Sequence, residues 1–360
     1  MRKDKIKIGF VGFGNRVENV YMPLFKKAES IFEISGFYTR RADRETEVID
    51  KFGIKSFKSN EEVCKNSDVV IAFCPTEVQY DVLTEITKFS DHRTGDQCPA
   101  KILLETPVTD HRIAHLDMST SSNICVAEQW PFLPLEQFKN SLIESKTLSR
   151  PFLVQNDCRT LDYHAIAQLR TYLGRDVMPV RVFGSSVGAN IPRFMDKNGN
   201  IKEGPEFWDI AQVIFSSGAI LSHNFSYNCK IAPFRSMQTL RYYSDNGTVI
   251  SGKKDDKDND YEIVDVRYLD KGLDTNHMNV LVKKSEAGAT LEISDSASGI
   301  SWMNPYGNIG LTDQETAMCT LVASLAEGNV LYSTRDAFLD SLIMNAIKQS
   351  CSSGQLVNFG

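Results

Sequence analysis

Residues 5–17, KIKIGFVGFGNRV, contain the strand, turn and helix start that decide the fold of the N-terminal part of the chain. Residues 6–11 predict a buried strand, residues 12–14 a tight turn, and we expect a helix to begin near Arg16. Backbone N–H groups at such a helix start can approach a phosphate, and the helix dipole favours negative charge there. Val17 occupies the third position of the G-x-G-x-x-G fingerprint, so this stretch alone also fits an ordinary strand–turn–helix.

Further strands alternate with helices as far as residue 128. Apolar runs at 32–38, 68–74, 101–105 and 124–128 predict strands, and a short strand is also expected at 54–57. Helices are expected at 20–28, 42–52 and 77–88. Strands that alternate with helices at this spacing are typical of a parallel sheet with right-handed crossovers. We therefore predict that residues 1–128 form an α/β domain of the Rossmann dinucleotide-binding type.

The pattern changes after residue 128, where β-type runs dominate. They lie at 151–158, 180–187, 208–216, 219–227, 237–243, 261–268 and 277–293, and helices are expected at 135–145, 164–173, 311–327 and 335–351. We predict that residues 129–360 form an α+β domain with a large, mostly antiparallel open sheet. Strands 210–215 and 219–225 have apolar residues on both faces, and helices can cover only one. The other face predicts a homodimer or homotetramer.

The composition limits the classes of function. The chain has 360 residues, of which 42% are hydrophobic and 24% charged, with a formal net charge of −6. Without a basic block or a long apolar run, neither nucleic acid nor a membrane is an expected partner. The 8 cysteines include no C-x-x-C pair, which favours reduced thiols in a cytoplasmic protein. His111 and His115 have no evident third ligand, so no metal site is predicted.

The end of the second strand predicts NADP(H) as the cofactor, with NAD(H) as the alternative. In many Rossmann folds an acidic residue at this point binds the ribose hydroxyls and repels a 2′-phosphate. Here Tyr38 is followed by Thr39, Arg40 and Arg41, without an acid. Thr39 can hydrogen-bond the phosphate, and Arg40 can pair with it while stacking on adenine. The competing interpretation is that both arginines merely begin a surface helix.

Four separated segments resemble the glucose-fructose oxidoreductase / inositol dehydrogenase / rhizopine-catabolism (Gfo/Idh/MocA) family. They are the Gly12-x-Gly14 turn, residues 68–76 (DVVIAFCPT), residues 103–107 (LLETP) and the tail at 327–337 and 346–350. The resemblance implies an oxidoreductase that transfers hydride between a nicotinamide and a small, sugar- or polyol-like carbonyl or alcohol. It also implies that residues 68–76 lie near the nicotinamide and that residues 105–107 correspond to the family's Glu-Lys-Pro motif.

One departure from that motif leaves three hypotheses open. The family's lysine helps to move a proton at the substrate oxygen, but this chain has Thr106, whose hydroxyl does not ionise usefully at neutral pH. Another residue then carries the proton in a sugar or polyol oxidoreductase. Alternatively, the substrate is a readily protonated imine, as for the similar thiazolinyl imine reductases of biosynthetic pathways. The third hypothesis is a non-catalytic sensor that binds the dinucleotide without turnover.

Residues 159–174 are similar to the family segment that contains a catalytic histidine, which falls on His164. Imidazole titrates near neutral pH, so we expect His164 to carry the proton. Tyr163 is the second candidate and Asp162 the expected orienting partner; the family's acid three residues later is Ala167 here. The alternative is a histidine at a helix N-terminus that Asp162 merely caps.

The expected site can be stated residue by residue. The expected catalytic residues are His164, Tyr163, Asp162 and Thr106. The expected cofactor-binding residues are Gly12, Gly14, Asn15, Arg16, Thr39, Arg40, Arg41, Pro75, Thr76, Glu105, Glu128 and Trp130. Within this set we expect Glu105 to orient backbone or cofactor.

Overall fold

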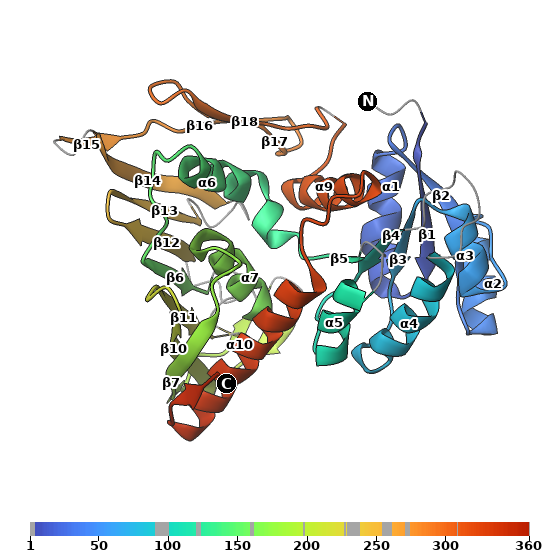
Figure 1. Ribbon diagram of the computed structural model, residues 1–360, viewed down its shortest axis with the longest axis horizontal. Coiled ribbons are helices and arrows are strands. Elements are labelled where there is room, and N and C mark those ends of the chain that lie inside the picture. Colours follow the sequence, from blue (N-terminus) through green and yellow to red (C-terminus); the bar gives the residue numbers. More distant parts are fainter. Residues whose placement is uncertain are drawn as a thin grey trace. The chain divides into compact units, whose positions relative to one another are not determined.

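The computed structural model describes residues 4–90, 101–119, 124–158, 162–196, 199–226, 228, 238–253, 261–270, 274–307 and 309–359. The chain forms two compact units, each of which is described by itself (Figure 1). Unit 1 comprises Met1–Leu133, Lys284–Thr290 and Asn304–Leu339, and unit 2 comprises Pro134–Lys283, Leu291–Met303 and Asp340–Gly360. In the part of the chain that is described, no helix is both long and apolar enough to span a membrane.

Unit 1 contains a five-stranded sheet in the order β2-β1-β3-β4-β5, with all neighbours parallel. The strands are β1 (Ile6–Val11), β2 (Phe32–Tyr38), β3 (Val69–Ala72), β4 (Lys101–Leu104) and β5 (Ile124–Val126). The predicted Rossmann-type parallel sheet is therefore confirmed. The prediction of a strand at 54–57 is wrong, because this segment makes only a single β-bridge, between Ser56 and Phe37. Of its four side chains, only that of Phe57 is buried in the core.

The helices of unit 1 connect and cover these strands. They are η1 (Val17–Tyr21, a π-turn), α1 (Met22–Lys27), α2 (Ala42–Phe52), α3 (Asn60–Asn66), η2 (Thr76–Val78), α4 (Gln79–Ser90), α5 (His111–Ser119), η3 (Trp130–Phe132) and α9 (Asp313–Ala326). Helix α9 begins with a capping box between Thr312 and Glu315 and packs against β3 and β4. Lys101 Nζ donates to the carbonyl of Ala326, so a C-terminal segment completes the N-terminal domain.

Unit 2 contains a nine-stranded sheet in the order β15-β14-β13-β12-β6-β11-β10-β7-β19. Its strands are β6 (Leu153–Asp157), β7 (Pro179–Ala189), β10 (Glu206–Phe215), β11 (Ile220–Phe225), β12 (Thr239–Ser244), β13 (Gly247–Lys253), β14 (Tyr261–Asp270), β15 (Asp274–His277) and β19 (Val357–Asn358). Strands β6 and β11 are parallel and the other neighbours antiparallel, which confirms the mostly antiparallel sheet.

Two small sheets accompany the large one. Strands β16 (Leu281–Lys284), β17 (Thr290–Asp295) and β18 (Ile300–Met303) form one, and β8 (Phe194–Met195) and β9 (Ile201–Lys202) form the other. The β-type run predicted at 277–293 does not form one continuous strand, because it is divided among β15, β16 and β17. The left-handed Gly288, with φ +83°, makes the turn between the last two.

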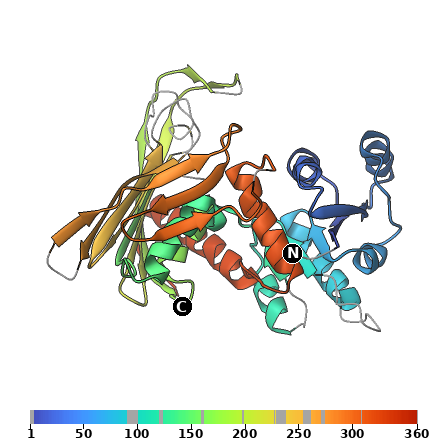
Figure 2. The same cartoon turned by 90° about the horizontal axis from the view of Figure 1, so that it is seen from above.

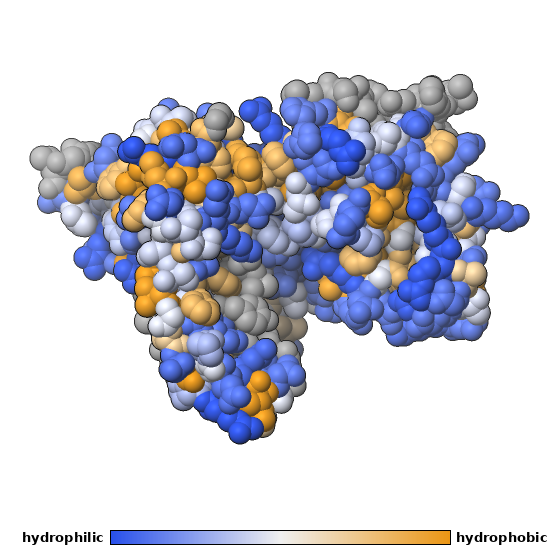
Figure 3. Space-filling model, turned by 90° about the horizontal axis from the view of Figure 1, so that it is seen from below, coloured by the Kyte–Doolittle hydropathy of each residue, from blue (hydrophilic) through white to orange (hydrophobic). Residues whose placement is uncertain are grey.

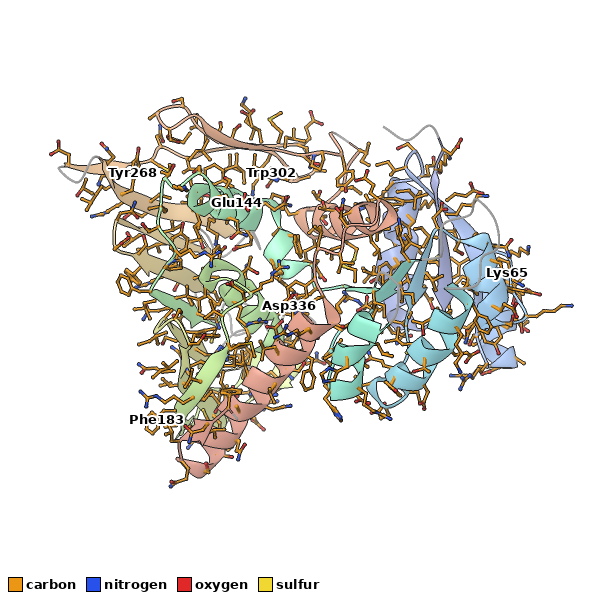
Figure 4. The ribbon with its side chains drawn as sticks, viewed as in Figure 1. Lys65, Glu144, Phe183, Tyr268, Trp302 and Asp336 are labelled. Atoms are coloured by element: carbon orange, nitrogen blue, oxygen red, sulfur yellow. The ribbon has the colours of Figure 1, made fainter. Side chains whose placement is uncertain are left out.

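Helices cover one face of the large sheet (Figure 2). They are α6 (Pro134–Glu144), α7 (Asp162–Leu173) and the part of α10 (Thr334–Ser353) that belongs to unit 2. Val154, Leu221 and Tyr242 are fully buried on that side. On the other face Phe183 is 57% exposed and Ile210 46% exposed, and Phe183 points away from the helices (Figure 4).

Candidate functional site

The glycine turn after β1 is shaped by the chain's own packing. Gly12 has a φ of +82°, and a Cβ there would lie 1.9 Å from the carbonyl oxygen of Phe73, which follows β3. A Cβ on Gly14 would lie 2.2 Å from the Phe73 ring. Asn15 and Arg16 then begin the helical segment, whose first N–H groups have no intrahelical acceptor. The turn therefore brings free backbone donors to the carboxyl edge of the sheet, as binding a pyrophosphate requires.

Glu105, at the end of β4, is the centre of a buried cluster at this edge. Its carboxylate accepts from Arg16 Nε at 2.8 Å, from the Tyr21 hydroxyl, and from the backbone N–H of Thr106 at 3.2 Å. Although burial opposes it, the charge of Glu105 raises the pKa of Arg16 above its ordinary value. Burial, together with the same carboxylate, raises the pKa of Tyr21 well above its ordinary value. At neutral pH Arg16 is therefore a cation and the Tyr21 hydroxyl keeps its proton.

Two glutamines extend the cluster to the neighbouring strand ends. Gln79 begins α4 after β3, and its Nε2 donates to the Glu105 carbonyl at 3.1 Å. Gln129 follows β5, and its Oε1 accepts from Arg16 Nη2 at 3.5 Å. Glu105 and its partner Arg16 thus join the ends of β1, β3, β4 and β5. Tyr21, Gln79 and Gln129 were not expected at the site; for Gln129 the only signal in the sequence is its place after Glu128.

The arginines after β2 differ in how closely they are paired with acidic side chains. Arg41 pairs with Asp43, and both side chains are mostly exposed. The Arg41 N–H also approaches Thr39 Oγ1 at 3.4 Å. Arg40 is 68% exposed and lies 3.8 Å from Glu85, which is a loose ion pair. Arg40 is therefore the arginine more available to an anionic ligand.

Arg44 of α2 stabilises the glycine turn through contacts with Phe13. Its Nε donates to the Phe13 carbonyl at 3.1 Å, and its guanidinium lies 5.8 Å from the centre of the Phe13 ring. Arg44 also pairs with Glu18 of η1 and, at 2.7 Å, with Glu47. Lys51 pairs with the other oxygen of Glu18. This cluster was not predicted from the sequence.

The remaining expected residues of unit 1 lie after β3 and β5. Pro75 precedes η2, whose first residue is Thr76. Glu128 is 2% exposed, and its Oε1 accepts from the backbone N–H of Trp130 at 3.3 Å. Beside Pro75, burial raises the pKa of Cys74 to about 11, against the opposing charge of Arg40, so its thiol stays protonated at neutral pH.

The expected catalytic histidine lies at the start of α7 in unit 2. Asp162 is the first residue of the helix, and its side chain lies outside the described part. The rings of Tyr163 and His164 have centroids 4.3 Å apart at an interplanar angle of 45°, and both residues are half-buried. Ala167, one turn further on, is fully buried. The structure thus brings Tyr163 and His164 together.

Two buried polar clusters hold the C-terminal half of α7. Arg170 pairs with Asp340 of α10 at 2.6 Å, and at most 2% of either side chain is exposed. Tyr172 donates to Glu136 of α6, which also pairs with Lys139 at 2.9 Å; Lys139 in turn donates to Ser251 Oγ at 3.0 Å. We call Glu136, Lys139 and Tyr172 the inner triad, and its three side chains are at most 1% exposed.

A metal site does not emerge from the described residues. His111 is 73% exposed and lies 3.7 Å from Asp110. Among the residues that the structure describes, no group of three or more His, Cys, Asp or Glu side chains is arranged to hold a metal ion.

Comparison with known proteins agrees with this geometry. Residues 6–114 match a family model described as GFO_IDH_MocA, "Oxidoreductase family, NAD-binding Rossmann fold". No curated protein matches the sequence. The match confirms the resemblance drawn from the sequence over residues 6–114 and indicates an oxidoreductase with an NAD-binding Rossmann domain.

Solved structures share the fold along the whole chain. UDP-N-acetylglucosamine 3-dehydrogenase GnnA from Acidithiobacillus ferrooxidans aligns with a TM-score of 0.62 at 13% identity, covering 98% of this chain and 100% of that one. An aldose-aldose oxidoreductase from Caulobacter crescentus gives 0.63 at 13%, covering 99% and 100%. A super-repressor mutant of Gal80p from Saccharomyces cerevisiae gives 0.63 at 12%, covering 99% and 98%. At these identities the likeness shows the fold alone.

Proposed function

We propose that this chain, an oxidoreductase with the NAD-binding domain of the Gfo/Idh/MocA family, transfers hydride between NADP(H) and a small sugar- or polyol-like carbonyl or alcohol. The observation that supports it best is the convergence of four strand ends on the pair of Glu105 and Arg16. In open α/β sheets, ligands bind at this carboxyl edge. The names of two neighbours in fold, a sugar-nucleotide dehydrogenase and an aldose-aldose oxidoreductase, favour a sugar-like substrate.

The residues present fit NADP(H). Gly12, Gly14, Asn15 and Arg16 would receive the pyrophosphate, and Thr39 with Arg40 the 2′-phosphate. The family resemblance assigns Pro75 and Thr76 to the nicotinamide half, and Glu105, Glu128 and Trp130 are the other expected cofactor-binding residues. The cofactor, when bound, supplies the hydride. The end of β2 offers no carboxylate to repel a 2′-phosphate, while Arg40 is mostly exposed and only loosely paired.

Titration of the protein with NADPH and NADH tests the cofactor assignment. We expect tighter binding of NADPH, and Arg40→Asp should invert that preference, a change of about 10–100-fold in the ratio of Kd values. Arg41→Asp is the matched control with a smaller effect, because Arg41 is already engaged by Asp43. Equal or tighter binding of NADH by the unaltered protein would overturn the NADP(H) assignment.

We assign to His164 the transfer of the proton to and from the substrate oxygen. Reduction of a carbonyl produces an alkoxide that must be protonated as it forms, and a positioned acid contributes about 10²–10⁴-fold. Thr106 can donate a hydrogen bond but not ionise usefully, and Glu105 is occupied by Arg16 and Tyr21. Tyr163, whose ring lies against His164, is the second candidate, and Asp162 the orienting residue.

Single-turnover oxidation of bound NADPH by a panel of ketoses and aldoses, followed across pH, tests this role. His164→Ala should lose most of the rate while keeping cofactor affinity, whereas Thr106→Ala should lose far less. Tyr163→Phe keeps the ring beside His164 and separates the two candidates. A His164→Ala variant with the original rate and pH profile would transfer the role to Tyr163 or to the substrate itself.

Imine reduction is the second candidate, and Thr106 favours it. An imine is readily protonated without a strong acid, so a site lacking the lysine suits it. The discriminating result is turnover of cyclic imines at rates that His164→Ala leaves unchanged. If NADPH binds but neither carbonyls nor imines oxidise it, the sensor hypothesis replaces both.

We also expect a homodimer or homotetramer that forms through the open face of the large sheet. Exposed apolar side chains such as Phe183 and Ile210 lie on that face, and Figure 3 shows hydrophobic patches within a largely hydrophilic surface. Such side chains gain free energy when a partner covers them. Light scattering that gives a monomer of 40.4 kDa at micromolar concentration would contradict this expectation.

A further inference from the structure

Arg16 is the charged group that this edge presents to a ligand. Its side chain is 33% exposed, whereas that of Glu105 is 4% exposed. The Glu105 carboxylate accepts hydrogen bonds from three donors, one of which is the Arg16 guanidinium itself. The other members of the cluster, Tyr21, Thr106 and Gln129, are uncharged, so a ligand at this point meets the cation first.

The strand order indicates which half of a dinucleotide lies there. Residues after β2 take the adenosine end, and the sheet runs β2-β1-β3-β4-β5. Arg16 leaves the turn after β1 in the opposite direction, because its partners Glu105 and Gln129 follow β4 and β5. The guanidinium therefore lies on the side of the sheet where the nicotinamide half belongs.

Charge at this place acts differently on the two forms of the cofactor. The nicotinamide ring of NADP⁺ is positive, and it becomes neutral when it accepts a hydride to give NADPH. A cation nearby disfavours the oxidised ring and leaves the reduced ring nearly unaffected, and an anion does the reverse. At an effective dielectric constant near 20, two unit charges about 7 Å apart interact strongly enough to change a binding ratio tenfold or more.

We infer that Arg16 and Glu105 set the redox balance of the bound nicotinamide, with Arg16 favouring the reduced form, so that hydride transfer from the substrate to the bound cofactor is favoured over the reverse step. The inference rests on the proposed function and adds the favoured direction of the hydride step to it. Arg16 is ionised at every working pH, so this preference is permanent rather than switched. Arg16 does not move a proton, and that role stays with His164.

Equilibrium titrations with NADPH and with NADP⁺, read by protein fluorescence without any substrate, test the inference. The unaltered protein should bind NADPH more tightly than NADP⁺. Arg16→Gln removes the cation and leaves the anion, so it should shift the ratio of the two Kd values about tenfold toward NADP⁺, or about 30 mV for this two-electron couple. Arg16→Lys keeps the charge and should restore most of the preference.

Glu105→Gln provides the opposite charge change at nearly constant shape. It leaves Arg16 uncompensated, so the ratio should move toward NADPH, and the two variants should differ in sign. A general loss of affinity cancels in each ratio, which separates charge from distortion of the turn.

The titrations distinguish failure of the proposed function from failure of this inference. If the unaltered protein binds neither NADPH nor NADP⁺, the proposed function is wrong. If both bind but Arg16→Gln and Glu105→Gln keep the original ratio, or move it in the same direction, this inference is wrong and the proposed function is unaffected.

Discussion

Each unit of the molecule contains a carboxylate that joins a cation to a tyrosine hydroxyl, and the two differ in exposure. In unit 1, Glu105 binds Arg16 and Tyr21 at the edge of the parallel sheet, and a third of the Arg16 side chain is open. In unit 2, the inner triad of Glu136, Lys139 and Tyr172 is closed on all sides. The same chemistry can therefore present charge to a ligand in one place and only fix helices in the other.

The largest expected difference concerns the cations. Lys139→Met leaves Glu136 buried without its counter-ion and should lower the free energy of unfolding by about 3–5 kcal/mol. Arg16→Met should cost less, about 1–3 kcal/mol, because a third of the Arg16 side chain is exposed and Glu105 keeps the Tyr21 hydroxyl and a backbone N–H as donors. Urea denaturation at pH 7, followed by circular dichroism, measures both. Equal losses would show that exposure does not separate the two clusters.

A double variant sharpens this prediction. Lys139→Met combined with Glu136→Leu replaces the buried ion pair by apolar side chains of similar size. Such replacements are often neutral or stabilising, so most of the loss from the single change should be regained. A double variant as unstable as Lys139→Met alone would mean that the pair itself stabilises unit 2.

The next largest effect separates two neighbouring tyrosines of unit 2, Tyr172 and Tyr242, whose rings are tilted by 34° with centroids 5.3 Å apart. The Tyr172 hydroxyl donates to Glu136, so Tyr172→Phe should cost about 1–3 kcal/mol. Among the described residues, the buried Tyr242 hydroxyl has no hydrogen-bond partner, so Tyr242→Phe should change stability by less than about 0.5 kcal/mol. Thermal unfolding of the two variants side by side decides; a larger loss for Tyr242→Phe would contradict the assignment.

The corresponding change in unit 1 should be smaller. Tyr21→Phe removes one donor from Glu105, which keeps Arg16 and the backbone N–H of Thr106. We expect a loss of about 1 kcal/mol in the free energy of unfolding. The measurement is the same denaturation experiment, and a loss above that of Tyr172→Phe would reverse the ranking of the two clusters.

The smallest effect appears at alkaline pH. Burial raises the pKa of Tyr21 and of Tyr242 well above the ordinary value near 10. The folded state then holds protons that the unfolded state releases, so this stabilisation is complete below pH 10 and is lost as pH rises beyond it. By pH 10 each tyrosine should lower the free energy of unfolding by about 0.4 kcal/mol. Tyr242→Phe should have a flatter dependence between pH 9 and 10.5; an unchanged slope would contradict this.

Local patterns predicted most of the fold, because burial repeats along each element. Strand β2 and helix α2 have the bounds that periodicity indicated. Strand β13, GTVISGK, was missed although Thr248, Val249 and Ile250 favour a strand, because this β-branched run is only three residues long and lies between two glycines. It is held by pairing with β12 on one side and β14 on the other, which no window of its own sequence contains.

The site was less predictable for the same reason. Gly12, Gly14 and the arginines after β2 were recognisable because their signals are local. The contact between Tyr21 and Glu105 joins residues 84 positions apart, and only the order of the parallel strands brings them together. The pairing of Arg41 with Asp43 is local, but composition alone does not indicate which arginine it occupies.

Phe73 has a consequence for how such sequences are classified. Its carbonyl and ring occupy the space that side chains at positions 12 and 14 would need, so both glycines are required before any nucleotide arrives. A descendant that had abandoned nucleotide binding would still be selected to keep Gly-x-Gly, and a motif search would still count it as a dehydrogenase. After loss of nucleotide binding, substitutions should therefore appear first at Arg16 and Arg40. The exposed parts of these two side chains would be conserved only for contact with a ligand.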